Sequence, residues 1–218
     1  MTALDPRQAY RLWAPNYRGD NALCVLEDQL VSALTPSPQG KRLLDVGCGT
    51  GLRLRNCGAA FSFGVDASPE MLAAGGLANV AAADVRALPF SPGVFDLVWC
   101  RLMLGYLPDL GAGYAELARV CRAEGQVMVS DFHADATRAG HRQTFRDTDG
   151  ALHEITHYAY DGDAHQEAAA AAGLSLLFQH DGAVGPAIRP LYQQANRLDM
   201  YERNRGLAVV ALFLFEKG

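Results

Sequence analysis

The chain is poor in the features that mark several classes of protein. It has five cysteines in 218 residues, and no two of them show C-x-x-C spacing. Scattered thiols in an odd number argue against a metal cluster and are typical of a reduced, cytoplasmic protein. The first residues lack the basic and then apolar pattern of a secretion signal, and the longest apolar stretch, 207–215, is too short to cross a bilayer. We therefore expect a cytoplasmic protein without a metal ion and without a membrane partner.

An excess of positive charge is also missing. Lysine and arginine number 19 against 24 acidic residues, which leaves a formal charge of −5. Proteins that hold a phosphate backbone usually present a basic face, so this balance argues against a nucleic-acid partner. Half of the residues are hydrophobic, which is ample for one buried core. No pattern indicates an oligomeric state.

A glycine-rich segment at residues 43–51, Leu-Leu-Asp-Val-Gly-Cys-Gly-Thr-Gly, is the most informative part of the chain. The apolar run 41–46 predicts a buried parallel strand, and we expect a helix from Gly51 to Cys57. A glycine turn between a strand and a helix lets a ligand lie against bare backbone. A dinucleotide fingerprint would need a glycine at position 52, where this chain has Leu52.

Three further apolar runs follow at the spacing of alternating strands and helices. They span residues 60–65, 78–83 and 94–100. Asp66 directly follows the first run and Asp84 the second, so each carboxylate lies at the edge of the sheet where open α/β proteins bind ligands. This rhythm predicts a parallel sheet.

Together these segments resemble the class I S-adenosyl-L-methionine (SAM) methyltransferases. The similarity is to the small-molecule subgroup that includes the ubiquinone/menaquinone C-methyltransferases and the biotin-pathway malonyl-thioester methyltransferase, and it covers about residues 5–132. It implies SAM as the cofactor, held by Asp45, Gly47, Cys48, Gly49, Gly51, Asp66, Ala67, Met71, Asp84, Val85 and Cys100. It also implies a small-molecule acceptor that is methylated on an O, C or N atom.

The resemblance assigns roles to two carboxylates and has one gap. Asp66 would accept the two ribose hydroxyls, and Asp84 would accept the exocyclic amine of adenine. The family often has a histidine or asparagine pair within residues 102–107, where this chain has Met103, Leu104, Gly105 and Tyr106. The gap leaves open which residues act on the acceptor.

We predict a Rossmann-like methyltransferase fold of the α/β class, which is a doubly wound, seven-stranded, mostly parallel sheet whose last strand is antiparallel. The chain is expected to form a single domain, 1–218. Its parts would be a helical lid (1–35), the cofactor-binding core (41–132), a substrate-side insert with helices (133–205) and the final strand (206–218).

The second half of the chain breaks the alternation. Two segments with period-two patterning, 140–147 and 152–160, flank the turn Thr148-Asp149-Gly150 and predict a β-hairpin inserted after strand five. Other expected elements are a helix capped by Asp20, helices over 163–172 and 190–203, and strands over 174–180 and 207–216.

All six histidines lie at or after position 133. His133 directly follows the predicted fifth strand, so we expect it in the ligand crevice, as a general base or as a group that orients the acceptor. Asp131 lies two residues earlier and would steady its ring. Tyr17 is the second catalytic candidate, because it resembles an aromatic residue of the family's lid.

The other histidines carry weaker signals. His153 and His157 are four residues apart, which on a helix would suit a metal. On a strand the same spacing separates them by about 13 Å, which argues against a shared ion. His165 and His180 are expected at the surface or at a strand end.

Two other interpretations remain open. A carboxyl methyltransferase acting on a free or carrier-bound acid would use Arg101, Arg142 or Arg146 as a clamp for the anion. A SAM-binding regulatory protein without turnover would need only the cofactor residues.

Overall fold

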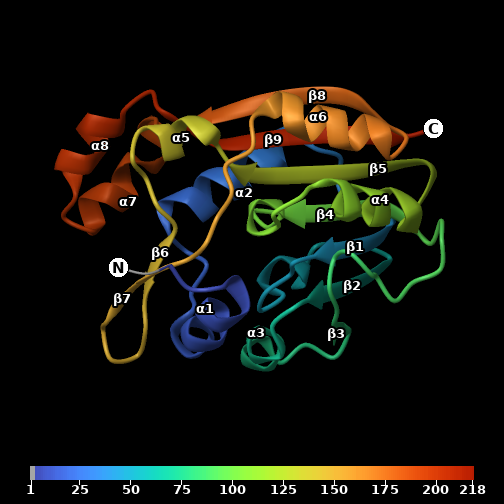
Figure 1. Ribbon diagram of the computed structural model, residues 1–218, viewed down its shortest axis with the longest axis horizontal. Coiled ribbons are helices and arrows are strands. Elements are labelled where there is room, and N and C mark those ends of the chain that lie inside the picture. The colour runs from blue at the N-terminus through green and yellow to red at the C-terminus, as the bar shows by residue number, and fades with distance from the viewer. Residues whose placement is uncertain (1–2) are drawn as a thin grey trace.

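The structure is a computed structural model that describes residues 3–218. Within that range the main sheet has seven strands in the order β3-β2-β1-β4-β5-β9-β8 (Figure 1). Strands β1, β2, β3, β4 and β5 run parallel to one another, whereas β9 lies between β5 and β8 and is antiparallel to both. The predicted sheet with an antiparallel last strand is therefore confirmed. The strands are β1 (Arg42–Val46), β2 (Phe61–Asp66), β3 (Val80–Ala82), β4 (Phe95–Arg101), β5 (Cys121–Phe132), β8 (Leu174–Ala183) and β9 (Ala208–Lys217).

Helices cover both faces of this sheet. The α-helices are α1 (Pro6–Trp13), α2 (Ala22–Leu34), α3 (Pro69–Gly75), α4 (Gly111–Val120), α5 (Ala134–Arg138), α6 (Gly162–Ala171), α7 (Arg189–Gln194) and α8 (Leu198–Asn204). Four short 3₁₀ turns lie between them in the described range, namely η1 (Ala14–Asn16), η2 (Leu52–Leu54), η3 (Leu104–Tyr106) and η4 (Pro186–Ile188).

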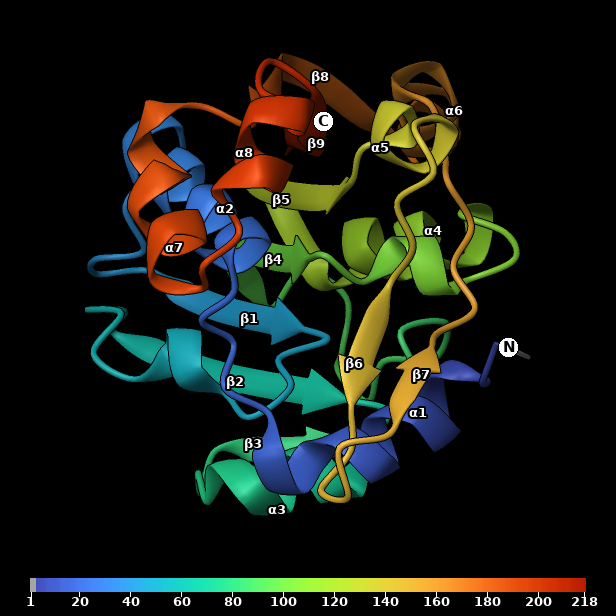
Figure 2. The ribbon, with the colours of Figure 1, turned by 90° about the vertical axis from the view of Figure 1, so that its left-hand side faces the viewer.

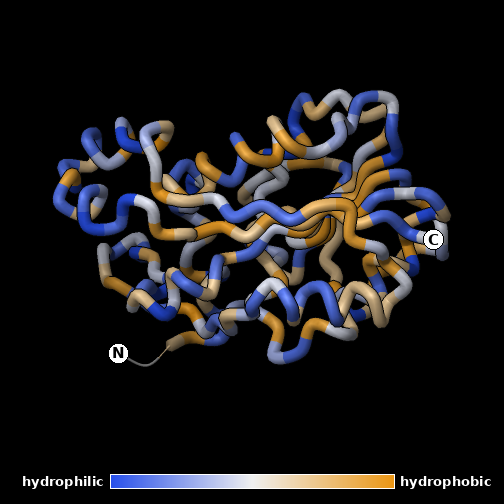
Figure 3. The backbone as a smooth tube through the Cα atoms, turned by 90° about the horizontal axis from the view of Figure 1, so that it is seen from above, coloured by the Kyte–Doolittle hydropathy of each residue, from blue (hydrophilic) through white to orange (hydrophobic). Residues whose placement is uncertain are grey.

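Alternation along the strands decides which helix each side chain meets. Leu44, Val98 and Val127 pack in one core cluster with residues of α4 and α6. Their neighbours Leu43 and Leu97 pack in a second cluster with Val31 of α2. Hydrophobic residues accordingly gather along the central strands (Figure 3). Both faces are buried, which explains why these strands read as continuous apolar runs.

The predicted hairpin forms, with shorter strands than expected. Strand β6 (Thr144–Arg146) pairs antiparallel with β7 (Leu152–Glu154). The hairpin joins the N-terminal segment, because the backbone N–H of Leu4 donates to Glu154 O at 2.8 Å and that of Thr156 donates to Leu4 O at 2.9 Å. Figure 2 shows α1 and the hairpin together, in front of the carboxyl ends of the parallel strands.

Three local predictions were wrong. The expected helix after the glycine-rich segment is only the turn η2, between two left-handed residues, Gly51 (φ 68°) and Asn56 (φ 61°). The expected helix 190–203 is two helices, divided where Asn196 takes φ 53°. Asn21, rather than Asp20, caps α2, since its side chain accepts from the N–H of Cys24 at 3.0 Å.

Candidate functional site

A cavity of about 290 Å³ lies at the carboxyl ends of β1, β2, β4 and β5. Its floor comes from the loop after β1 and the tips of β2 and β3. Its roof comes from α1 and from the residues on either side of the hairpin, Gln143 and His157. Ligands of open α/β sheets bind at this edge, so the site has the location that the sequence predicts.

The glycine loop presents bare backbone to the cavity. Gly47 (φ 75°) and Gly49 (φ 57°) both line it in the left-handed conformation. A Cβ at Gly47 would lie 2.6 Å from Met103 Cγ, and one at Gly49 would lie 3.2 Å from Met71 Cε. The N–H of Cys48 donates to Val65 O at 3.0 Å and ties the loop to β2. A side chain at either glycine would crowd the space next to the floor.

Gly75, at the end of α3, supports the glycine loop from outside the cavity, and sequence reasoning missed it. A Cβ on it would lie 2.0 Å from the backbone oxygen of Thr50, so the helix packs directly on the glycine loop. The only signal was the run of small residues at 73–76. Close packing against a backbone atom leaves no flexible side chain that could move aside.

Asp66 is held by the floor itself. Its carboxylate accepts the N–H of Gly49 at 2.8 Å and the N–H of Ser68 at 2.8 Å. Burial raises the pKa of Asp66, and these two hydrogen bonds partly oppose that shift. The carboxylate lines the cavity in a set position, as an acceptor for hydroxyl groups.

Asp84 also lines the cavity, but it has protein partners. Arg86 donates to its two oxygens at 2.9 and 2.7 Å, and Arg7 lies 3.2 Å away. The hydrogen bonds from Arg86 are the main reason that the pKa of Asp84 falls to about 2. An adenine amine would share this carboxylate with Arg86.

Most of the predicted cofactor residues are brought together. The cavity is lined by Gly47, Cys48, Gly49, Asp66, Ala67, Met71, Asp84 and Val85. Among the described residues, Asp45, Gly51 and Cys100 do not line it. Asp45 and Cys100 are fully buried in the sheet, and Gly51 packs beside Leu77.

His133 is not among the described residues that line the cavity. The chain turns into α5 directly after β5, and the ring of His133 caps that helix by accepting the N–H of Asp135 at 3.1 Å on Nδ1. Its Nε2 lies 3.6 Å from Asp181 of β8. The helix α5 was not expected from the sequence, and its start turns this ring away from the crevice.

The roof of the cavity is aromatic. Tyr17 packs edge-on against Trp13 at 4.9 Å between ring centroids, and Trp13 stacks on Tyr10 at 5.7 Å. The hydroxyls of Tyr10 and Tyr106 lie 2.9 Å apart. Burial raises the pKa of Tyr17 to about 12. Its phenol therefore stays protonated near neutral pH and can donate a hydrogen bond to a ligand.

Asp131 of β5 and His157 form a polar pair at the cavity wall. The side chains of Asp131 and His157 both line the cavity, with Asp131 Oδ1 3.6 Å from His157 Nε2. The other oxygen, Oδ2, lies 3.6 Å from Nε2 of His165. His165 is 1% exposed, so the expectation of a surface or strand-end histidine was wrong at this position.

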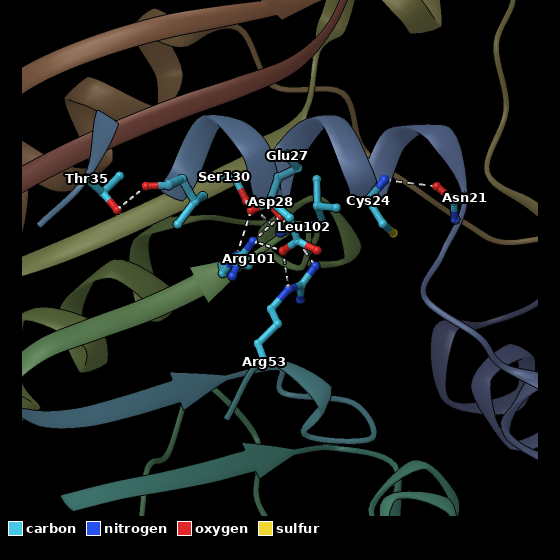
Figure 4. A network of polar contacts seen from close by, with 10 residues as sticks. Asn21, Cys24, Glu27, Asp28, Thr35, Arg53, Arg101, Leu102 and Ser130 are labelled. Atoms are coloured by element: carbon cyan, nitrogen blue, oxygen red, sulfur yellow. Dashed lines mark hydrogen bonds and ion pairs between the residues drawn. The ribbon is translucent and has the colours of Figure 1, made fainter. Parts of the chain in front are cut away.

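Of the three arginines considered as an anion clamp, Arg101 lines the cavity but is paired with carboxylates of the protein. Arg101 donates to Glu27 at 2.8 Å and pairs with Asp28 of α2, and Arg53 joins the same two carboxylates (Figure 4). Arg142 and Arg146 are not among the described lining residues. This arrangement does not favour a carboxyl methyltransferase.

Two structural features are absent from residues 3–218. No helix there is long and apolar enough to cross a membrane. No group of three or more histidine, cysteine, aspartate or glutamate side chains in that range is placed to hold a metal ion.

The chain is similar in sequence to known methyltransferases. Residues 44–129 match the family model described as a methyltransferase domain. The chain is 33% identical to a malonyl-[acyl-carrier protein] O-methyltransferase of Erwinia billingiae, over 59% of this chain and 54% of that protein. It is 40% identical to a demethylmenaquinone methyltransferase of Mycolicibacterium vanbaalenii, over 46% of this chain and 45% of that protein. The chain thus spans about half the length of these relatives.

A solved structure shows the same fold over most of the chain. It is an S-adenosylmethionine-dependent methyltransferase from Mesorhizobium loti, with a TM-score of 0.68 and 19% identity. The match covers 88% of this chain and 98% of that one. This match shows the fold, and the family model and the curated relatives confirm the resemblance that the motifs indicated.

Proposed function

Because the chain contains a methyltransferase domain, we propose that it transfers a methyl group from SAM to an O, C or N atom of a small acceptor. SAM supplies an activated methyl group on a sulfonium centre, together with its own leaving group. The protein then has to place the acceptor in line with that methyl group and exclude water. A cavity between a preformed floor and an aromatic roof suits this task.

The observation that carries the proposal is the carboxylate of Asp66 beside the bare glycine loop. It sits in the cavity, held by two backbone N–H groups, and keeps lone pairs for a vicinal diol such as the ribose of SAM. Met71 and Val85 add apolar walls next to it, which fit the flat adenine ring. The residues present therefore match the parts of the cofactor.

The charges at the cavity support a neutral acceptor. Each arginine that lines it in the described range pairs with a carboxylate of the protein, namely Arg7 and Arg86 with Asp84, and Arg53 and Arg101 with Glu27. An anionic acceptor would have to compete with those pairs. An uncharged metabolite in the cytoplasm is the acceptor that we propose.

Removal of the Asp66 charge tests this function. Asp66→Asn should weaken binding of S-adenosylhomocysteine by about 2–3 kcal/mol, the usual worth of hydrogen bonds to a charged group. Isothermal calorimetry measures the change, with Asp163→Asn, an exposed substitution on α6, as the control. Unchanged affinity would remove Asp66 from the site. A wild-type protein that binds neither SAM nor S-adenosylhomocysteine would overturn the proposed function.

A further inference from the structure

Four polar side chains form a chain that ends at the acceptor side of the cavity. They come from four separate elements, with Tyr114 on α4, His165 on α6, Asp131 on β5 and His157 after β7. Tyr114 and His165 are buried, whereas Asp131 and His157 line the cavity. None of them has a role in the cofactor floor described above.

Asp131 is the centre of this group. It is 2% exposed, and its Oδ2 has no hydrogen-bond partner among the described residues. Its Oδ1 accepts the N–H of Phe132 at 2.8 Å. A buried carboxylate without full compensation is costly to keep, which points to a function rather than to stability.

The hydrogen-bond directions behind Asp131 can be assigned. Burial raises the pKa of Tyr114 well above its usual range, so its hydroxyl keeps the proton. That hydroxyl lies 2.9 Å from Nδ1 of His165 and donates to it. Burial also lowers the pKa of His165, which is then a neutral ring with its proton on Nε2. This nitrogen lies 3.6 Å from Asp131 Oδ2, which is beyond hydrogen-bond distance but is the nearest polar approach recorded for that oxygen.

The other oxygen of Asp131, Oδ1, faces a ring nitrogen of His157. It lies 3.6 Å from Nε2, a separation that commonly shortens when ligands close a site. A carboxylate at Nε2 selects the tautomer with the proton on that atom. Nδ1 of His157 then holds the lone pair. Tyr106 is the other titratable group beside this ring, edge-on at 5.5 Å.

Gly105 explains how His157 reaches this place. A Cβ at Gly105 would lie 2.2 Å from His157 Nε2 and 2.9 Å from Asp131 Oδ1. The segment is held there by the N–H of Tyr158, which donates to Gly105 O at 2.7 Å. The imidazole from the hairpin segment thus occupies the volume that a side chain at position 105 would fill.

We infer that Asp131 and His157 form a dyad that removes a proton from the acceptor during methylation, which assigns the acceptor to the phenols or other weak acids. This inference rests on the proposed function. The acceptor atom bonds to the methyl carbon while the sulfur–methyl bond breaks, and the thioether keeps the bonding pair. The proton of the acceptor moves to Nδ1 of His157 and passes to solvent after product release. Asp131 is the positioning residue.

The first test uses the protein without any ligand. Nitrogen-15 spectra of the histidine rings should show His157 as the Nε2–H tautomer, with its signal assigned through His157→Gln. Asp131→Leu should abolish this preference and give a mixture of tautomers. Gly105→Ala, which displaces the ring without removing any polar group, serves as a second variant should Asp131→Leu fail to fold. A wild-type ring with its proton on Nδ1 would overturn the dyad.

The second test measures proton transfer in a complex without turnover. The protein saturated with S-adenosylhomocysteine is titrated with 4-nitrophenol, which is yellow only as the phenolate. We expect the bound probe to ionise at a pH where the free probe is protonated. This colour should be lost in His157→Gln and in Asp131→Leu, and kept in His180→Gln, an exposed change on β8. A bound probe that stays colourless in the wild type would overturn the inference.

The remaining outcomes separate the two proposals. Normal binding of S-adenosylhomocysteine, combined with a probe that fails to bind, would overturn the weak-acid acceptor and leave the proposed function intact. Loss of the phenolate colour in His133→Gln, with retention in His157→Gln, would return the role to His133. Absence of S-adenosylhomocysteine binding in the wild type would overturn the proposed function instead.

Discussion

The two helices of residues 1–35 are attached to the rest of the molecule by opposite kinds of chemistry. Helix α2 carries Glu27, which is fully buried and bonded to Arg101 at 2.8 Å and to Ser130 at 2.6 Å (Figure 4). Helix α1 has no such anchor within the described range and packs mainly through aromatic rings, such as Trp13 on Phe145 at 5.0 Å. The segment that the sequence presents as one lid is therefore two parts.

The energies of these contacts differ several-fold. Breaking one partner of a buried ion pair costs about 3–5 kcal/mol, because a charge is left without compensation. An aromatic pair is worth about 0.5–1.5 kcal/mol beyond its burial. Helix α2 therefore belongs to the rigid body. We call α1 and residues 142–158 the cover, because no buried arginine–carboxylate pair in the described range ties this part to the sheet.

The largest expected effect follows from breaking the α2 anchor. Arg101→Met should lower the free energy of unfolding by about 3–5 kcal/mol, measured by denaturant titration. Burial alone would raise the pKa of Glu27, but Arg101 and its other partners outweigh burial and lower it. Without Arg101 this carboxylate loses its main counter-charge.

The double variant Glu27→Met with Arg101→Met is the control. It removes both charges and should recover much of the loss, because two apolar side chains can pack where the pair lay. A single Arg101→Met variant that loses less than about 1 kcal/mol would show that α2 is held no more firmly than α1.

The second effect concerns Asp45, which lies below this network on β1. Burial is the main reason that its pKa rises from the usual 3.8 to about 6. A raised pKa in the folded state means that the stability from this group is complete below about pH 4 and is lost as the pH rises through 6. About two pKa units correspond to about 3 kcal/mol.

Asp45→Asn should remove that dependence. The stability difference between variant and wild type should shift by about 3 kcal/mol in favour of the variant between pH 4 and pH 8. Urea titrations across this range measure it, and the pH-independent cost of the buried amide cancels in the slope. A difference that does not change with pH would mean that Asp45 ionises normally. Unchanged binding of S-adenosylhomocysteine would also show that the Asp45 carboxylate does not contribute to cofactor binding.

The floor of the site was predictable because its signals are local. Asp66 and Asp84 follow apolar runs at once, and parallel strands bring their ends to one edge of the sheet. The glycine motif lies within nine consecutive residues, 43–51. The antiparallel direction of the last strand, β9, followed from the family resemblance.

The residues that were missed owe their importance to contacts between segments that are distant in the sequence. Gly75 meets Thr50, and Gly105 meets His157, at separations along the chain that no pattern encodes. His133 was chosen for its place after β5, yet the short helix α5 redirects its ring. A five-residue helix is too short for a periodic signal. One clue was available: the chain has glycine at position 105, in a segment where the family often has histidine or asparagine.

The smallest expected effect tests whether the cover opens as a unit. Phe145→Leu keeps an apolar side chain but loses the stack on Trp13, so local opening should become easier by about 0.5–1.5 kcal/mol. Native-state hydrogen exchange at the amides of Leu4 and Thr156, which join α1's segment to the hairpin, should then speed up roughly 2- to 12-fold while global stability changes little. Phe61→Leu, which breaks an exposed stack on β2, should leave these amides unchanged. If both amides keep their wild-type rates in Phe145→Leu, or if exchange rises equally across the sheet, the cover is part of the rigid body and its contrast with α2 disappears.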